Sequence, residues 1–347
     1  MSRMAFTSGT ALLVGVLGHA YAAPPTAVAL PQTMQAVAID HAGGPQVLTL
    51  HTLPVPKPAA DEVLIAVHTA GVASWDAGLR EHPGEIKHSA LPLVLGTDGA
   101  GVIAALGSQV HDFKLGEQVY SYSWDNPQGG FYAEYVAVPA TLVGRVPAGM
   151  NLVQAGAMGT TALTAIQGID DALHMKSGET LIIHGAAGGV GTLAVQFARL
   201  RGVRVLATAT DAQGLALVKR LGAEAVVDGR SGDIAAAARA LAPGGVDAVL
   251  GLAGGDSLER CLDALRPGGR FAFPFGVHPE PRSRPGLDAV RYNAVAGPAE
   301  FERLNKAIVA ARLEVPIAAE YPLAQAAQAH ERLEQGHVLG KIVLRIR

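Results

Sequence analysis

A glycine-rich segment carries the clearest chemical signal in the sequence. His184-Gly185-Ala186-Ala187-Gly188-Gly189-Val190-Gly191 follows an apolar run at 181–183 and precedes a helical pattern at 191–201. The glycines at 185, 188 and 191 let a turn tighten and let the backbone approach a pyrophosphate. A helix that starts there directs free N–H groups and its positive dipole end at that anion. We therefore predict that a dinucleotide is bound by Gly185, Ala187, Gly188, Gly189, Val190 and Gly191.

The end of the next expected strand indicates which dinucleotide binds. Strand 203–207 continues into Thr208-Ala209-Thr210, and no Asp or Glu stands near Ala209 to hold the ribose hydroxyls, although Asp211 lies two residues later. Small residues with hydroxyls leave room for a 2′-phosphate, so we predict NADP(H), with Thr208 and Thr210 as cofactor contacts. Arg230, after the third expected strand, is the nearest candidate for the cationic partner of that phosphate. An exposed surface arginine is the alternative interpretation.

The elements around this segment alternate between strand and helix. Short apolar strands are expected at 181–183, 203–207, 225–227, 246–250 and 270–273, and helices at 191–201, 213–221, 234–241 and 257–265. Apolar strands that alternate with helices predict an α/β fold with a doubly wound parallel sheet. We also expect Gly276, after the last of these strands, to contact the cofactor.

The remainder of the chain has a different pattern. Residues 34–146 show short β-runs broken by Gly and Pro, which predicts a partly open or barrel-like β unit. The tail contains expected helices at 301–311 and 323–335 and a terminal strand at 340–346, in which we predict that Lys341 contacts the cofactor.

Composition excludes several classes of protein. The 347 residues carry a net charge of −3 with no long basic run, so nucleic acid is not an expected partner. The single cysteine, Cys261, rules out an intramolecular disulfide framework and any multi-cysteine zinc site. Its apolar surroundings predict a buried, small hydrophobic side chain.

The first residues have the pattern of a secretory signal peptide. An apolar run at 11–18 is followed by Ala20-Tyr21-Ala22, a small-x-small cleavage pattern. We predict a signal peptide at 1–22 and a linker at 23–33, which implies a periplasmic or secreted protein with no stable membrane insertion. The alternative is a start at Met34, which implies a cytoplasmic protein.

Several further segments resemble the zeta-crystallin-like quinone oxidoreductases, a zinc-independent family of the medium-chain dehydrogenase/reductase superfamily. The resemblance extends from Met34 to Ile346. The matching segments, in the family's order, are Ala70-Gly71-Val72 with Asp76, Leu95–Val102, Phe113–Val119, Gly130–Tyr135, the glycine segment with Gln196, Ala329–Leu333 and Gly340–Leu344.

This resemblance implies a GroES-like β domain, split in sequence, around an inserted Rossmann-type sheet. It places the first part of the catalytic domain at 34–152, the NADP-binding domain at 153–289 and the return segment of the catalytic domain at 290–347. The active site should lie between the two domains. The family often pairs subunits through edge strands of the dinucleotide domain, which suggests a homodimer.

The positions of the zinc ligands in related families are changed here. Zinc relatives carry a cysteine shortly after the Gly71 position and Gly-His-Glu at the Gly96 position. This chain reads Ala73-Ser74-Trp75-Asp76 and Gly96-Thr97-Asp98, so the thiolate and the imidazole are both absent. We therefore expect no zinc and no other metal.

Without a metal, the cofactor carries the chemistry, and the expected reaction is hydride transfer from NADPH to a quinone or similar conjugated carbonyl. Many quinone oxidoreductases carry Asn at the Ala73 position and Tyr at the Gly78 position, so direct transfer of quinone activity is in question. We nominate Ser74, Trp75 and Tyr122 as catalytic replacements. Trp75 could stack on a flat acceptor, and Tyr122 could donate a proton or bond a carbonyl.

Two other functions stay open. An enoyl or enone reductase would use the same scaffold and the same hydride. A non-catalytic NADP-binding sensor would bind the cofactor without turnover, and the missing Asn and Tyr side chains are what keep it open.

Overall fold

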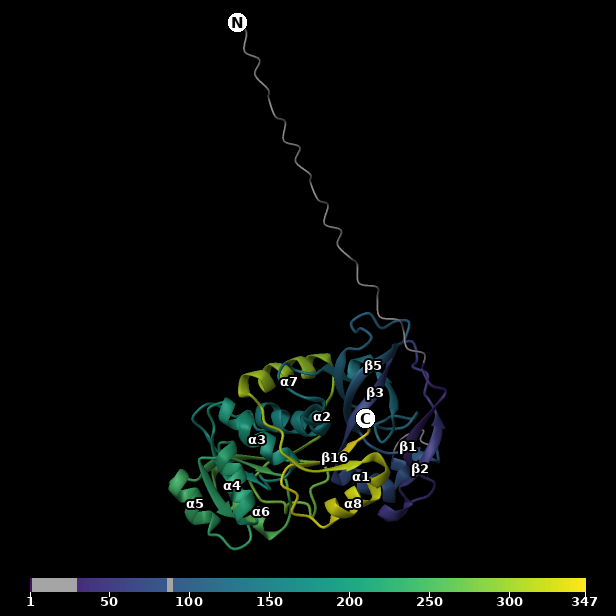
Figure 1. Cartoon of the computed structure of the whole chain (residues 1–347). Helices are drawn as coiled ribbons and strands as arrows, with labels where there is room; N and C mark the ends of the chain where they lie inside the picture. The colour runs from purple at the N-terminus through teal and green to yellow at the C-terminus, as the bar shows by residue number, and fades with distance from the viewer. Residues whose placement is uncertain (2–29, 86–89) are drawn as a thin grey trace. The chain divides into compact units, whose positions relative to one another are not determined.

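Six parallel strands form the sheet from which the glycine-rich segment extends, in the order β11-β10-β9-β12-β13-β14 (Figure 1). Numbered from β9, this order is 3-2-1-4-5-6, which is the strand order of dinucleotide-binding doubly wound folds. The α/β prediction with a Rossmann-type sheet is therefore confirmed. The strands are β9 (Thr180–His184), β10 (Arg204–Ala209), β11 (Ala225–Asp228), β12 (Val246–Gly251), β13 (Leu265–Pro274) and β14 (Ala289–Tyr292).

Helices cover both faces of this sheet. Leu181 and Ile183 of β9 pack in one core with Leu193, while Ile182 packs in another core with Leu258. Alternate residues of one strand therefore face different helices, which is why the run at 181–183 is apolar throughout. The helices are α3 (Gly189–Leu200), α4 (Ala212–Leu221), α5 (Ile234–Leu241) and α6 (Asp256–Leu262).

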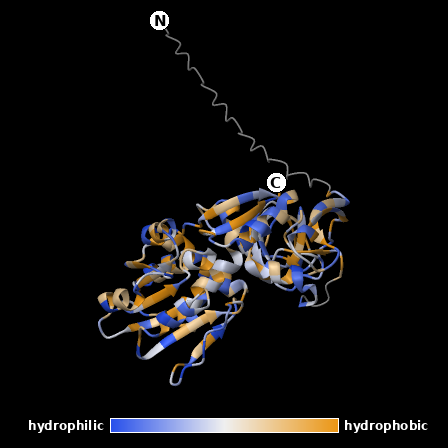
Figure 2. Ribbon diagram, turned by 90° about the horizontal axis from the view of Figure 1, so that it is seen from below, coloured by the Kyte–Doolittle hydropathy of each residue, from blue (hydrophilic) through white to orange (hydrophobic). Residues whose placement is uncertain are grey.

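A second, mostly antiparallel sheet of seven strands is centred on β3 (Glu62–Val72), which pairs with β5, β7 and β16. A three-stranded sheet in the order β2-β1-β4 completes the β unit. Figure 2 shows apolar residues concentrated along the strands of the molecule. The remaining strands are β1 (Thr33–Ile39), β2 (Thr49–Pro54), β4 (Leu93–Val94), β5 (Asp98–Leu106), β6 (Gln118–Tyr122), β7 (Tyr135–Pro139), β8 (Val143–Arg145), β15 (Ile317–Pro322) and β16 (Lys341–Arg345).

The end of the chain returns to this second sheet. β16 pairs antiparallel with β3, and β15 pairs parallel with β16. The GroES-like unit is therefore split in sequence, as predicted. β14 belongs to the parallel sheet and spans the predicted boundary between the inserted domain, which ends at 289, and the return segment, which starts at 290. The domain limits themselves stay a prediction.

Two helices were not expected from the sequence. α1 (Ser74–Glu81) interrupts the predicted β unit, and α2 (Leu152–Gln167) precedes β9. α2 is buried at every position from Ala155 to Gln167, so it lacks the amphipathic period by which a surface helix is recognised. α7 (Pro298–Ala311) and α8 (Ala326–Glu334) overlap the two helices predicted in the tail.

The computed structural model describes residues 1, 30–85 and 90–347. Residues 2–22 of the predicted signal peptide and residues 23–29 of the predicted linker lie outside them. Met34, the alternative start, is buried in β1. Within the described ranges, no helix is long and apolar enough to cross a membrane.

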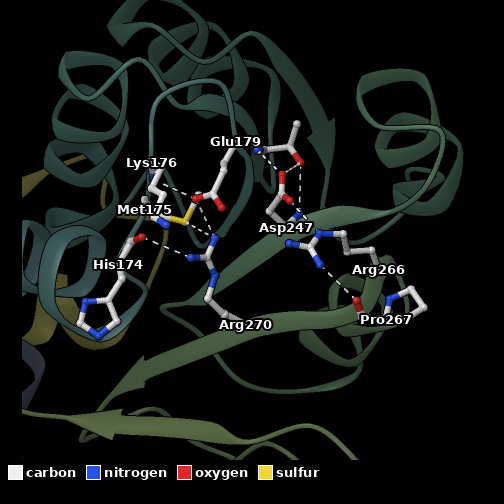
Figure 3. Close-up of polar contacts among 9 residues, drawn as sticks. His174, Met175, Lys176, Glu179, Asp247, Arg266, Pro267 and Arg270 are labelled. Atoms are coloured by element: carbon white, nitrogen blue, oxygen red, sulfur yellow. Dashed lines mark hydrogen bonds and ion pairs between the residues drawn. The ribbon is translucent and has the colours of Figure 1, made fainter.

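The amino ends of the central parallel strands are joined by a polar cluster (Figure 3). Asp247 of β12 accepts the N–H and the hydroxyl of Thr180, the first residue of β9, at 2.7 and 2.8 Å. Arg266 Nε donates to the same carboxylate at 2.7 Å. Nearby, Arg270 pairs with Glu179 at 2.7 Å. The cluster lies at the opposite end of β9 from the glycine segment.

We expect Asp247→Ala to lower the free energy of unfolding by about 2 kcal/mol, because the N–H and the hydroxyl proton of the buried Thr180 lose their acceptor. The Thr180 hydroxyl keeps only the bond that it accepts from the backbone N–H of residue 247. NADPH affinity should be unchanged. Urea denaturation would measure the loss, with Asp263→Ala as the control, since the ion pair of Asp263 with Arg284 is solvent-exposed on the Asp263 side. Equal stability of the two variants would contradict this role for Asp247.

Candidate active site

The glycine segment turns from the end of β9 into α3. Gly185 has a φ of +77°, a conformation that favours glycine. A Cβ on Gly191 would lie 2.5 Å from Ala186 Cα and from Gly185 O, whereas a Cβ on Gly188 would meet nothing closer than Gly185 O at 3.6 Å. Gly191 therefore permits α3 to pack under the turn. Gly188, at the N-cap of α3, leaves the turn without a side chain where a pyrophosphate would approach, so this backbone fits the predicted cofactor.

Thr208 holds the turn from the neighbouring strand. Its Oγ1 accepts the N–H of Gly185 at 3.1 Å and lies 2.8 Å from His184 Nδ1. Burial lowers the pKa of His184 to about 4, so its ring is neutral. Thr208 is 1% exposed. Its hydroxyl therefore positions the glycine turn, and the predicted contact with the cofactor stays a prediction.

The beginning of β16 lies against the same turn. Gly340 donates its N–H to Ala187 O at 3.0 Å, and Gly188 and Gly340 form an isolated β-bridge. Lys341 is 4% exposed, and its Nζ donates to Val72 O at 3.2 Å. The return segment thus brings a buried ammonium group from the glycine turn to the end of β3.

Trp75 meets Thr97, which stands where zinc relatives carry a histidine. Trp75 Nε1 donates to Thr97 Oγ1 at 2.8 Å, and Lys341 Nζ lies 5.6 Å from the centroid of the Trp75 ring. Trp75 is half-buried, and Ser74, the first residue of α1, is exposed. A ring, a hydroxyl and a cation are therefore assembled close to the glycine turn.

A basic group lies at the carboxyl ends of β10 and β11. Arg230 Nη2 lies 3.0 Å from His337 Nε2, and Thr210 Oγ1 lies 3.3 Å from His337 Nδ1. All three side chains are exposed. Two predicted cofactor residues, Thr210 and Arg230, are thus brought together by a histidine from the return segment. Gly276 lies in the turn after β13, at the same edge of the parallel sheet, with a φ of +86°.

Comparisons with known proteins identify the family. Residues 59–148 match the alcohol dehydrogenase GroES-like domain, and residues 221–344 match a model described as zinc-binding dehydrogenase. Quinone oxidoreductase of Mus musculus is 31% identical over 327 residues, which cover 90% of this chain and 97% of the relative. The chain belongs to the quinone oxidoreductase family. This confirms the resemblance found in the sequence.

Two further members of this family are informative. The probable quinone oxidoreductase of Schizosaccharomyces pombe is 34% identical over 330 residues, covering 89% of this chain and 96% of that protein. The crystal structure of Escherichia coli quinone oxidoreductase complexed with NADPH matches at a TM-score of 0.80 and 25% identity, covering 90% of this chain and all of that one. The predicted activity class is confirmed: this family member is an oxidoreductase that uses NADP(H).

One matching family model and this chain differ in their metal ligands. One matching model is described as zinc-binding. In the part of the chain that the structure describes, no group of three or more His, Cys, Asp or Glu side chains could hold a metal ion. Cys261 is buried in α6, and burial raises the pKa of its thiol to about 12. The prediction that Cys261 is a buried hydrophobic side chain is confirmed.

Tyr122 is placed beside a buried carboxyl group. It pairs with Asp98 in the register of β5 and β6, and it is half-buried. Burial, together with Asp98 and Asp125, raises the pKa of Tyr122 to about 12. The phenol is therefore protonated at neutral pH, as a proton donor must be, and the catalytic role of Tyr122 stays a prediction.

A buried polar network supports α1 in this family member. Asp76 Oδ2 accepts the N–H of Ala73 at 2.8 Å and the hydroxyl of Tyr132 at 3.2 Å. Tyr132 Oη lies 3.0 Å from His330 Nε2, and Arg80 Nη1 lies 3.0 Å from His330 Nδ1. Burial lowers the pKa of His330 to about 3, so the neutral ring accepts from Arg80 and donates to Tyr132. The network fixes the helix that carries Ser74 and Trp75.

We expect Asp76 to make stability depend on pH. Burial, together with Asp98, raises its pKa from 3.8 to about 7. Because the folded-state pKa is raised, the stabilisation is complete below about pH 3.8 and is lost as pH rises through about 7. The stability difference between the wild type and Asp76→Asn should therefore fall between pH 4 and pH 8.

Thermal unfolding across this pH range measures that difference, with the exposed Asp288→Asn as the control. A difference that is constant with pH would contradict the prediction.

Two side chains of these groups, His337 and Thr97, are not indicated as contacts by the sequence. His337 stands more than 100 positions from Arg230 and Thr210, and Thr97 is an ordinary hydroxyl residue directly before β5. The one signal in the sequence is that Thr97 stands where the zinc relatives carry a histidine.

Proposed function

We propose that the chain reduces quinones or similar conjugated carbonyl compounds with NADPH, without zinc. The observation that carries the proposal is the hydrogen bond from Trp75 to Thr97, the residue that stands in place of a zinc-ligating histidine of related families. A half-buried aromatic ring suits a flat, electron-poor acceptor. The named quinone oxidoreductases among the relatives support the same class of acceptor.

The chemistry at this place divides between the cofactor and the chain. NADPH, when bound, supplies the hydride. The backbone of residues 185–191 would hold its pyrophosphate, with Lys341 beside it as a buried cation. Trp75 would orient the acceptor, and Tyr122 would keep a protonated phenol close to it. Positioning of two reactants in one place accounts for a large share of such rate enhancements.

A panel of acceptors tests this proposal. NADPH consumption would be followed with several quinones and with conjugated enals and enones, after removal of metal ions by a chelator. Turnover of quinones at an undiminished rate in the chelated protein is the expected result. Turnover of enals and enones alone would favour the enoyl or enone reductase. Tight NADPH binding without reduction of any acceptor would favour the sensor and refute the reductase.

Two predictions about the setting of the enzyme belong to this proposal. The signal peptide predicts export, and N-terminal sequencing of the mature protein would refute it by finding Met34 as the first residue.

The homodimer predicted from the resemblance would use an edge of the dinucleotide sheet, and β14 is such an edge strand. A monomeric mass in light scattering would contradict it.

A further inference from the structure

A buried hydroxyl without a partner lies directly after β6. Ser123 is 2% exposed, and among the described residues its Oγ has no hydrogen-bond partner. Buried polar groups in folded proteins are nearly always hydrogen-bonded, and the exceptions call for an explanation. A ligand that accepts a hydrogen bond is one such explanation.

A second hydroxyl has an unused proton. Thr97 is 3% exposed, and its Oγ1 accepts the Nε1–H of Trp75. An indole nitrogen can only donate, so the direction of this bond is fixed and the proton of the Thr97 hydroxyl remains available. No acceptor for that proton is found in the described parts of the chain. By donating to Thr97 Oγ1, Trp75 restricts the directions in which the Thr97 hydroxyl can donate its own proton.

The two residues that carry these hydroxyls adjoin one another. Ser123 donates its backbone N–H to Thr97 O at 2.9 Å, and both residues line one small pocket with Leu79 and Trp124. Trp75 and Trp124 are the only tryptophans of the chain. A pair of free O–H donors is thus bordered by apolar and aromatic side chains.

We propose that the hydroxyls of Thr97 and Ser123 bind the carbonyl oxygen of the acceptor, with Trp75 as a positioning residue for Thr97. This inference rests on the proposed function and names the group of the acceptor that the chain recognises. It restricts the acceptors to compounds whose reacting system ends in a carbonyl oxygen, such as quinones and conjugated enones.

The chemical reason is the charge that develops on this oxygen. The acceptor gains the hydrogen and the electron pair of the C–H bond that breaks in NADPH, and the displaced π-electrons move to the carbonyl oxygen. That oxygen then takes a proton from water, and oxidised NADP⁺ leaves. Two O–H donors on buried residues would stabilise the negative oxygen where it forms.

Substitution of the hydroxyls separates this role from a structural one. Ser123→Ala and Thr97→Val should each lower kcat/KM for the acceptor by about 10- to 100-fold, with NADPH affinity unchanged. Ser123→Ala removes a buried hydroxyl that has no protein partner, so its melting temperature should equal or exceed that of the wild type. The conservative Thr97→Ser should retain most of the activity.

Ser121→Ala is the matched control on the same strand. Ser121 Oγ donates to Leu142 O at 2.7 Å, so this variant should lose stability and keep kcat/KM for the acceptor. Trp75→Phe tests the positioning role, because it removes the N–H and keeps a ring. Its effect on kcat/KM should be several-fold in the wild type and absent in the Thr97→Val background.

The outcomes distinguish this inference from the proposed function. An active wild type whose Ser123→Ala and Thr97→Val variants are equally active would overturn the carbonyl subsite and leave the reductase intact. A Trp75→Phe effect of the same size in both backgrounds would overturn the positioning role. A wild type that binds NADPH and reduces no acceptor would refute the proposed function, and the subsite with it.

Discussion

Gly188→Val should weaken NADPH binding by at least about 100-fold while leaving the fold intact. A Cβ at this position meets only Gly185 O, at an ordinary contact distance of 3.6 Å, and the backbone there is extended, with a φ of −78°. The side chain would instead occupy the place where the pyrophosphate approaches the start of α3. Fluorescence titration with NADPH would measure the loss, and thermal unfolding would show an unchanged melting temperature.

Gly191→Val should be compared with Gly188→Val, because a side chain at 191 disturbs the fold itself. Its Cβ would lie within 2.6 Å of three backbone atoms of Gly185 and Ala186, so the turn and α3 must separate. We expect lower stability as well as lost affinity. Gly244→Val, where a Cβ meets nothing within 4 Å, is the control and should behave as the wild type. Undiminished NADPH affinity in Gly188→Val would show that the pyrophosphate lies elsewhere.

Removal of the basic group at the carboxyl ends of β10 and β11 should reduce the preference for NADPH over NADH. Arg230→Ala and His337→Asn should each weaken NADPH binding by about 10-fold. The first variant removes a donor to the 2′-phosphate, and the second removes the ring nitrogen that holds the Arg230 guanidinium in place. NADH, which lacks that phosphate, should bind with unchanged affinity. Asn is the suitable replacement because His337 has a φ of +52°, a conformation that Asn tolerates better than Ala.

The ratio of kcat/KM for NADPH and NADH measures this preference. Arg239→Ala, on the exposed side of α5, removes the same charge away from the site and should leave the ratio unchanged. An equal loss of affinity for both cofactors in Arg230→Ala would show that the arginine does not contact the 2′-phosphate.

The sequence is most informative where function depends on spacing along the chain. The glycine turn needs three glycines between a strand and a helix, and this pattern is complete within eight residues. The strand and helix alternation from 181 to 273 is likewise local, so the Rossmann-type sheet could be predicted. α2 could not, because a helix that is buried on all sides has no polar face to reveal its period.

The polar contacts of the candidate site depend on distant positions, which is why they were missed. His337 reaches Arg230 and Thr210 only because β16 returns to the glycine turn through Gly340. Thr97 and Ser123 adjoin through one backbone hydrogen bond between β5 and β6. Nothing in the local pattern of either residue shows that its hydroxyl lacks a partner.

The departures from the family are compatible with the fold. A Cβ on Gly78, where many relatives carry Tyr, would meet nothing within 4 Å. Gly78 is three residues after Trp75 in α1 and lies on the same side of that helix. The absence of the tyrosine side chain at Gly78 therefore leaves space beside Trp75. The fold of the family does not require that side chain.

The most direct test of the account is the steady-state rate of NADPH and NADH oxidation with one quinone that the wild type reduces. The account predicts quinone-dependent oxidation of NADPH well above that of NADH, at a rate that a metal chelator does not lower. Equal rates with the two cofactors would contradict the assignment of the 2′-phosphate site. Activity that is lost on chelation and restored by zinc would contradict the metal-free mechanism.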